Sequence, residues 1–344
     1  MAFRKALLSW YNCHHRRLPF RETKDPYPVW LSEIMLQQTT MNAVLPYYER
    51  FLKTFPNLKT VANAKEQDLL KIWQGLGYYS RIRNFQEGCK QVLKKYNGNI
   101  PQTASELKKL KGIGDYTAAA IASICFGERQ AAIDGNVKRV LSRVFYYNKN
   151  QDSIEANAFF KKTANALLDP KHPGDFNQAM METGATICRP KKPMCLICPL
   201  QKFCIAKTKD PETLPIKKKQ HFVDVDYHAL LLEKNGKLLL KKPSPKNLIK
   251  NMWELPSHYD SQKSPKMTWK KIFKTLPKSF KKIGTVKHSI MNQKITTHIY
   301  IPEEKILKSR DYTLVSKKDL DKIPLNTLSK KIVKKFGNVL IKNS

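Results

Sequence analysis

The sequence predicts a mainly α-helical protein with an α+β domain at its carboxyl-terminal end. Up to about residue 209, apolar side chains recur at spacings of three and four, the period of a helix that buries one face. Past a lysine-rich connector, β-branched and apolar residues alternate instead. Asn235-Gly236 is typical of a tight hairpin turn, because both positions of that turn need positive φ. A chain of 344 residues suits about two such domains.

The helices are expected to follow one another in the first domain. The chain opens with an amphipathic helix within residues 1–24, and Pro19, Pro26 and Pro28 mark a break in helicity. Glu33 then lies on the first helix of the next apolar stretch. The expected helical segments are 29–55, 61–75, 80–96, 104–110, 116–126, 136–145 and 153–168.

The second domain is expected after a linker at residues 210–221, which combines prolines with consecutive lysines. Residues 227–242 hold two strand-like runs around the hairpin turn. The other expected elements are strands at 282–289, 294–301 and 312–316 and a closing helix at 325–336.

The charge balance predicts a polyanionic partner. The chain has 63 Lys and Arg against 28 Asp and Glu, a net charge of +35, which exceeds what solubility requires. Nucleic acid is the expected partner, with a generally basic proteome or a membrane surface as alternatives. Because no run approaches the roughly 18 to 20 apolar residues of a membrane span and no secretion signal opens the chain, we expect a cytoplasmic protein, nucleoid-associated if bacterial.

Four of the seven cysteines are clustered, with six, two and five residues between them. They are Cys188, Cys195, Cys198 and Cys204. Four thiolates in so short a span can close round one metal centre, and spacing leaves tetrahedral zinc and an iron–sulfur cluster both open. Four unrelated buried cysteines are the alternative without metal. Cys13, Cys89 and Cys125 are expected to be small core residues.

A glycine hairpin and a carboxylate form the candidate substrate site. Gly112 and Gly114 lie between two expected helices and allow positive φ and close backbone approach to a ligand. A hairpin that opens a helix also points unsatisfied N–H groups at a phosphate. Asp134 follows the second of these helices, in the sequence DGN.

Several motifs resemble those of one enzyme family. The run LKGIGDYTAAA resembles the helix-hairpin-helix of base-excision DNA glycosylases, and DGNVKRV and the cysteine spacing agree with it. VWLSEIMLQQT, GLGYYSRIRN and FNQAMMETGA narrow the resemblance to adenine DNA glycosylases of the MutY type. The resemblance implies a [4Fe–4S] cluster on the four cysteines. It also implies a helical glycosylase domain over 1–209, made of a six-helix barrel at about 25–130 and a cluster domain from 1–24 and 131–209.

The resemblance implies how the two carboxylates act. Glu33 would protonate N7 of an extruded adenine, and Asp134 would stabilise the oxocarbenium-like sugar by its charge or by transient attachment to C1′. The alternatives are that Glu33 is an exposed helix residue and that Asp134 caps the following helix. Tyr116 stands where bifunctional relatives carry a Schiff-base lysine, so we expect a monofunctional enzyme; a plain core aromatic is the alternative.

DNA contacts are expected at further positions. Gln38 and Tyr78 match wedge positions that fill the gap left by a flipped base, although a polar helix face and a core aromatic would explain them without DNA. The expected phosphate contacts are the hairpin glycines together with Arg81, Arg83, Lys111, Lys138 and Arg139.

The carboxyl-terminal domain, residues 222–344, resembles the Nudix-like domain that reads 8-oxoguanine opposite adenine, with NMWELP as the best local match. It has no catalytic Nudix box, so we expect no pyrophosphatase activity. In its recognition loop His288 and Ser289 are the polar candidates, while Ile290, Met291 and Asn292 depart from the family pattern. Adenine opposite 8-oxoguanine and adenine opposite guanine are therefore expected to be discriminated less sharply.

The expected partner is double-stranded DNA with adenine mispairs, bound by a monomer without a membrane. Two other functions remain open. One is a bifunctional endonuclease III-like pyrimidine glycosylase and lyase, which Tyr116 opposes. The other is a DNA-binding scaffold without catalysis, which needs no paired carboxylates.

Overall fold

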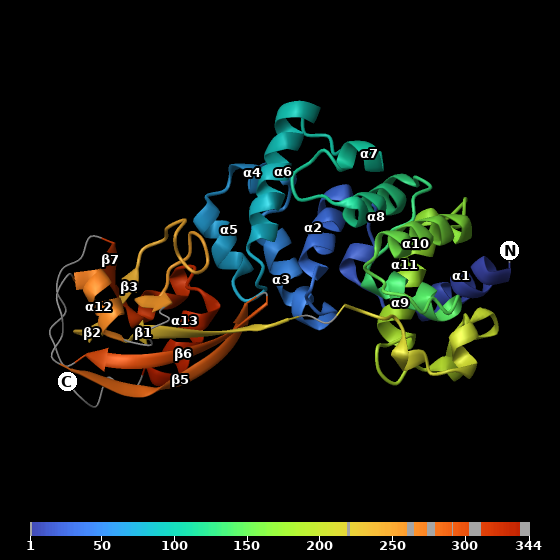
Figure 1. The fold of residues 1–344 in the computed structure, drawn as a ribbon. Coiled ribbons are helices and arrows are strands. Elements are labelled where there is room, and N and C mark those ends of the chain that lie inside the picture. The colour runs from blue at the N-terminus through green and yellow to red at the C-terminus, as the bar shows by residue number, and fades with distance from the viewer. Residues whose placement is uncertain are drawn as a thin grey trace. The chain divides into compact units, whose positions relative to one another are not determined.

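The computed structural model describes residues 2–218, 221–259, 265–273, 279–290, 292–302 and 311–337. The chain forms two compact units (Figure 1). The helical unit consists of Met1–Asn63 and Ser80–Lys219. The mixed unit consists of Ala64–Tyr79 and Gln220–Ser344. The prediction of a mainly α-helical protein with a carboxyl-terminal α+β part is confirmed.

The α-helices of the helical unit largely follow the apolar periodicity. They are α1 (Ala2–His14), α2 (Pro26–Leu36), α3 (Met41–Thr54), α4 (Leu58–Asn63), α6 (Ser80–Tyr96), α7 (Ala104–Leu107), α8 (Asp115–Phe126), α9 (Gly135–Val144), α10 (Ile154–Leu167) and α11 (Pro173–Glu182). A π-helical turn, Thr183–Ile187, continues α11. Among the described residues, no helix is both long and apolar enough to cross a membrane.

Two buried helices, α2 and α8, form the centre of the helical unit. Asp25 caps α2 by accepting from the Tyr27 backbone N–H at 2.9 Å, and Pro26 supplies a preset φ for the first turn. Helix α8 packs against α2, and its alanines Ala118 and Ala120 are fully buried, so small side chains let the helix backbones approach closely. Gly127, with φ of 72°, ends α8.

The mixed unit contains two sheets. One has the order β4-β1-β6-β5, with β1 (Val223–Leu230) parallel to β6 (Gln293–Pro302) and antiparallel to β4 (Ser257–Tyr259). The edge strand β5 (Phe280–Ile290) is antiparallel to β6. The other sheet has the order β2-β3-β7 and consists of Glu233–Lys234, Lys237–Lys241 and Tyr312–Ser316. The predicted Asn235-Gly236 turn joins β2 and β3, with φ of 51° and 69°.

Three helices complete the mixed unit: α5 (Glu66–Trp73), α12 (Pro265–Phe273) and α13 (Thr327–Phe336). The single helix predicted at 61–75 is wrong, since α4 ends at Asn63 and α5 begins at Glu66 in the other unit. Asn251 explains why α5 belongs there. Its side chain lies 3.1 Å from a Glu66 carboxylate oxygen, and its carbonyl accepts from Gln67 at 3.0 Å. Helices α11 and α12 and strand β4 were not predicted.

Helix α11 crosses α8 at a glycine. A Cβ atom on Gly174 would lie 2.7 Å from the Ser123 carbonyl oxygen and 2.8 Å from the Ile124 Cα, and backbone atoms cannot move aside as a flexible side chain can. We expect Gly174→Ala to destabilise the protein by about 1–3 kcal/mol and to lower its thermal midpoint by several degrees. Gly135→Ala is the matched control, because no atom lies within 4 Å of its added Cβ. Equal melting of the two variants would contradict this packing.

Candidate active site

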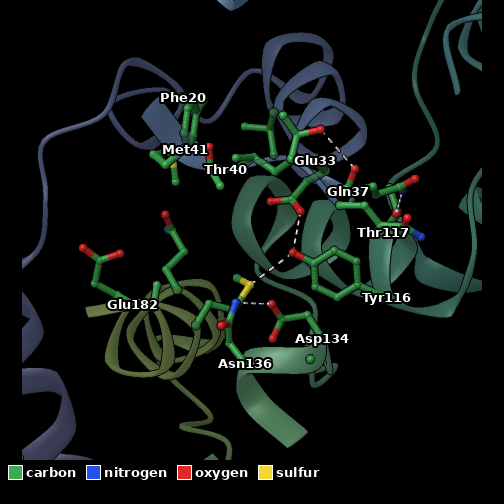
Figure 2. Close-up of a pocket in the computed structure, with 18 of the residues that line it drawn as sticks. Phe20, Glu33, Gln37, Thr40, Met41, Tyr116, Thr117, Asp134, Asn136 and Glu182 are labelled. Carbon is green, nitrogen blue, oxygen red and sulfur yellow. Dashed lines mark hydrogen bonds between the residues drawn. The ribbon is translucent and has the colours of Figure 1, made fainter. Parts of the chain in front are cut away.

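A cavity of about 1120 Å³ lies within the helical unit. Side chains from α2, α8, α9 and α11 and from the segment between α1 and α2 line it, and Figure 2 shows Glu33, Tyr116 and Asp134 facing one space. The structure thus brings together three site residues that are far apart in the sequence. Gln38, Gly112, Gly114 and Arg139 also line the cavity.

Glu33 lies on α2 and is only 7% exposed, so the alternative of an exposed helix residue is wrong. Its Oε2 accepts a hydrogen bond from the Tyr116 hydroxyl at 2.5 Å. Burial raises the pKa of Glu33 to about 7; the Tyr116 hydrogen bond opposes this shift, and the Asp134 charge adds to it. The carboxyl group can therefore hold a proton near neutral pH and release it.

Tyr116 stands in the first turn of α8, directly after the glycine hairpin. Besides Glu33, its hydroxyl lies 3.1 Å from the Met181 Sδ. Burial raises its pKa well above the usual value, and the Glu33 and Asp134 charges raise it further. Tyr116 therefore stays a phenol that donates to Glu33, and it lines the cavity rather than only filling the core.

Asp134 is the N-cap of α9. Its Oδ1 accepts from the Val137 backbone N–H at 2.8 Å and its Oδ2 from the Asn136 side chain at 2.7 Å. The predicted cap is thus confirmed, and it leaves the carboxylate at the cavity wall. Burial raises the pKa of Asp134, while the hydrogen bonds from Val137 and Asn136 lower it.

A buried arginine connects this carboxylate to the cysteine loop. Arg139 on α9 donates to the Asn136 Oδ1, to the Gly184 carbonyl and to the Cys188 carbonyl, each at 2.8 Å. Gly184 permits this approach, since a Cβ there would lie 2.6 Å from the Asn136 Cβ. Arg139 is 8% exposed, so its described contacts are structural, whereas the sequence suggested a phosphate contact.

Arg143, one turn further along α9, holds the cysteine loop directly. It is 1% exposed and donates to the Cys188 Sγ at 3.3 Å and to the carbonyls of Arg189 and Pro190 at 2.7 and 3.0 Å. A buried cation against a thiol suits a thiolate that carries negative charge. The two arginines thus anchor the loop from one helix.

The four clustered cysteines fit an iron–sulfur centre in donor type, since they supply four thiols within one short segment. All four are partly buried, and three of them pack against the core around Leu141 and Phe176. Burial, with a smaller contribution from the neighbouring cysteines, raises the pKa of Cys198 to about 12. Among the described residues, no three His, Cys, Asp or Glu side chains stand in metal-binding geometry. Of the remaining cysteines, Cys89 is buried, but Cys13 is exposed, so its predicted core position is wrong.

Glu182 on α11 is a cavity residue that the sequence did not single out. It is fully buried and accepts from the Arg16 Nε and Nη2 at 2.6 and 2.7 Å and from the Arg21 Nη2 at 2.7 Å. Burial opposes ionisation, but the hydrogen bonds and charges of the two arginines prevail and lower its pKa to about 2. The sequence holds one signal for this ion pair: Glu182 is an acid at the end of FNQAMME, and the run RRLPFR supplies arginines that could neutralise it.

Both wedge candidates have unusual backbones. Gln38 is exposed with φ of 57°, and Tyr78 is 46% exposed with φ of 46°. Few residues other than glycine adopt this left-handed region, and such strain clusters at functional sites. Gln38 belongs to the helical unit and Tyr78 to the mixed unit.

The remaining phosphate candidates have varied surroundings. Arg81 is 8% exposed and donates to the carbonyls of Ile34 and Met35 at 2.8 and 2.9 Å, which satisfies the end of α2. Lys111 is exposed beside the hairpin, where Gly112 has φ of 82° and Gly114 is also exposed. Arg83 is half-buried, and Lys138 is half-buried and donates to the Asn157 Oδ1 at 2.8 Å.

The recognition-loop candidates lie in the mixed unit. His288 and Ser289 belong to strand β5 rather than to a loop, opposite Ile295 and Lys294 of β6. Ser289 is exposed, and His288 is half-buried with its Nδ1 3.2 Å from the Lys331 Nζ. Met291 lies outside the described residues.

Comparison with known proteins identifies the family of each part of the chain. Residues 31–166 match the family model of the HhH-GPD superfamily base excision DNA repair protein, and residues 227–335 match that of the NUDIX domain. Adenine DNA glycosylase of Rattus norvegicus is 44% identical over 214 residues, 60% of this chain and 42% of the relative. The matched chain thus spans about two fifths of this mammalian relative's length.

A bacterial relative is covered more fully. Adenine DNA glycosylase of Buchnera aphidicola subsp. Baizongia pistaciae is 37% identical over 260 residues, 74% of each chain. The solved structure of a thermostable thymine-DNA glycosylase matches 60% of this chain and 95% of its own, with 30% identity and a TM-score of 0.55. The predicted helix-hairpin-helix fold and Nudix-like domain are therefore confirmed. The chain belongs to the adenine DNA glycosylase family, with a helical part of the HhH-GPD superfamily and a carboxyl-terminal NUDIX domain.

Proposed function

We propose that this protein is a monofunctional DNA glycosylase that flips out and hydrolyses adenine mispaired with 8-oxoguanine or guanine. The observation that carries the proposal is the cavity in which a protonatable Glu33, the phenol of Tyr116 and the carboxylate of Asp134 meet. Adenine excision is assigned to residues 1–209 and reading of the opposite base to residues 222–344. The enzyme acts as a cytoplasmic monomer on double-stranded DNA.

Glu33 is the general acid. An adenine that leaves as an anion is a poor leaving group, so protonation at N7 lowers the barrier to cleavage of its bond to C1′. The pKa of Glu33, about 7, keeps a large fraction of the carboxyl groups protonated at neutral pH. The donor hydrogen bond from Tyr116 stabilises the carboxylate that remains after the transfer.

Asp134 meets the positive charge that develops on the sugar. Two donors from the start of α9 hold its oxygens, so the negative charge is fixed in place before the reaction. Once the base has left, the Asp134 carboxylate stabilises the sugar cation, electrostatically or by a transient bond to C1′, until water attacks. Since Tyr116 has no amine, no Schiff base forms with the sugar, and the product is an intact strand with an abasic site.

The other cavity wall suits the flipped base. Glu182 stays ionised and holds Arg16 and Arg21, whose guanidinium groups offer donors at the cavity wall. A purine edge presents acceptors, so these donors can select an extruded base by its hydrogen-bonding edge. Gln38 and Tyr78 would fill the gap in the duplex, and Lys111, Gly112 and Gly114 would hold the backbone.

The direct test uses duplex DNA with adenine opposite 8-oxoguanine and, in a second arm, opposite guanine. We expect strand cleavage to appear only after alkali, because a monofunctional enzyme leaves the abasic strand intact. Glu33→Gln should slow excision by about 10²–10⁴-fold and Asp134→Asn by about 10²–10³-fold. Asparagine also caps helices, so Asp134→Asn should melt like the parent.

Each alternative would give its own result. Cleavage without alkali, with borohydride trapping of a covalent DNA adduct, would indicate an endonuclease III-like lyase. Absence of excision in both arms would favour the alternative of a DNA-binding scaffold without catalysis. Equal rates in the two arms would overturn the assignment of 8-oxoguanine reading to the carboxyl-terminal domain. Full excision by either carboxylate variant would contradict the assigned roles.

The pH profile tests the contact between Tyr116 and Glu33. The pKa of Glu33 is raised, so the acid form is present below about pH 7 and excision should decline as the pH rises through that value. Tyr116→Phe removes a hydrogen bond that lowers this pKa, so the alkaline limb of the single-turnover rate should move to higher pH. An unmoved limb would show that Glu33 is not the group that titrates.

The four cysteines are proposed to bind a [4Fe–4S] cluster, which would tie the loop from Cys188 to Cys204 into one body through four iron–sulfur bonds. Arg143 and Arg139 already hold the start of this loop to α9. We expect the purified protein to absorb in the visible range and to lose this band, together with thermal stability, in Cys198→Ser. A colourless, zinc-containing protein would contradict the cluster.

A further inference from the structure

Two neighbouring elements of the mixed unit carry many lysines and no acidic residue. Strand β5 reads FKKIGTVKHSI, and helix α13 reads TLSKKIVKKF. The sequence predicts a strand and a helix here. The structure places these two elements against each other.

Helix α13 turns one face to the core and the other to solvent. Leu328, Ile332 and Phe336, spaced by four, are buried in the core of the mixed unit with Val286 of β5. Gly284 permits this packing, because a Cβ there would lie 2.5 Å from the Phe336 ring. Outside this buried stripe the helix exposes lysines at a spacing of three and four: Lys331, Lys334 and Lys335.

Two of these lysines contact β5, the strand that carries His288, the residue proposed to read the lesion. Lys335 donates to the Thr285 carbonyl at 3.3 Å, and the Lys331 Nζ lies 3.2 Å from the His288 Nδ1. An ammonium group can only donate, so Nδ1 accepts and the proton of the imidazole is on Nε2. His288 thus stays a neutral ring that offers one N–H donor beside a fixed positive charge, and burial together with Lys331 lowers its pKa.

Helix and sheet stability account for only part of this pattern. Lys334 and Lys335 lie in the last turn of α13, where cations favour the helix dipole, and lysines on an edge strand such as β5 discourage sheet pairing. Lys331 lies neither in the last turn of α13 nor on β5, so neither reason explains its position beside His288. Like charges three and four residues apart cost about 0.2–0.5 kcal/mol per pair, and in the described part of the chain no carboxylate pairs with any of the three lysines.

We propose that Lys331, Lys334 and Lys335 of α13, together with His288, bind the phosphates of duplex DNA. Three ammonium groups lie along about 6 Å of helix axis, which suits consecutive charges of a polyanion. A membrane is a poorer partner, because the apolar face of α13 is buried in the core rather than exposed beside the lysines. The inference rests on the proposed function for its choice of DNA as the polyanion.

The proposed contact between the α13 lysines and DNA phosphates would orient the carboxyl-terminal domain on the duplex. Phosphate contacts carry no sequence information, but they set the register and orientation of a protein on the duplex. A helix that grips the backbone beside His288 would hold the end of β5 at one place along the groove. The lysines are therefore positioning residues for base reading.

The test is equilibrium binding of the full chain to an undamaged, fluorescently labelled duplex over a range of salt concentrations. Each lost phosphate contact lowers the slope of log K against log salt by about 0.9, so the triple variant Lys331→Ala, Lys334→Ala, Lys335→Ala should lower it by roughly 2–3. We also expect affinity at physiological salt to fall by roughly tenfold. Alanine has the highest helix propensity, so α13 should persist.

Two matched variants complete the experiment. Lys234→Ala, Lys237→Ala, Lys318→Ala removes the same charge from exposed positions at the three-stranded sheet and should leave the slope nearly unchanged. Replacing the three α13 lysines by arginine keeps the charge and should preserve binding. An unchanged slope in the alanine variant of α13, or an equal loss in the sheet variant, would overturn the proposal. Since no base is excised, a failure of the glycosylase function would appear only in the separate excision assay.

Discussion

The geometry of the candidate site depends on the buried guanidinium of Arg139. Its three hydrogen bonds join Asn136, which orients Asp134, to two carbonyls in the segment that leads into the cysteine loop. Hydrogen bonds to a charged donor contribute about 1.5–3 kcal/mol each, and a buried carbonyl left without one costs about 1–3 kcal/mol. The start of α9 and the cysteine loop are therefore held as one body.

Burial raises the pKa of two carboxylates of the same cavity, but their partners give the two groups opposite net shifts. Glu33 meets a neutral phenol and the charge of Asp134, so the cost of desolvation prevails and its pKa rises to about 7. Glu182 meets two guanidinium groups, which outweigh the same cost and lower its pKa to about 2. The cavity thus holds a proton donor and a permanent anion without any difference in residue type. Partner charges, rather than depth alone, set the chemistry of each group.

The helices, the Asn235-Gly236 hairpin and the residues of the motifs could be predicted from the sequence, because periodicity and turn chemistry are local. Glu182 could not be predicted, because its ion pairs with Arg16 and Arg21 come from a segment far away in the sequence. Arg81 and Arg139 were predicted to bind phosphates, because the sequence of a basic chain does not show which arginines are buried against carbonyl groups. The break between α4 and α5 escaped prediction, since tertiary contacts to Asn251 place α5 in the other unit.

The surroundings of the arginines shift the expected DNA contacts toward lysines. Arg81, Arg139 and Arg143 are each less than 9% exposed and donate to main-chain carbonyls, a task for which the planar, always charged guanidinium is well suited. An ammonium group is more strongly hydrated and remains at the surface, as it does along α13. The large positive charge of the chain therefore has two parts: buried arginines satisfy the ends and loops that shape the cavity, and exposed lysines supply most of the field that a phosphate backbone would meet.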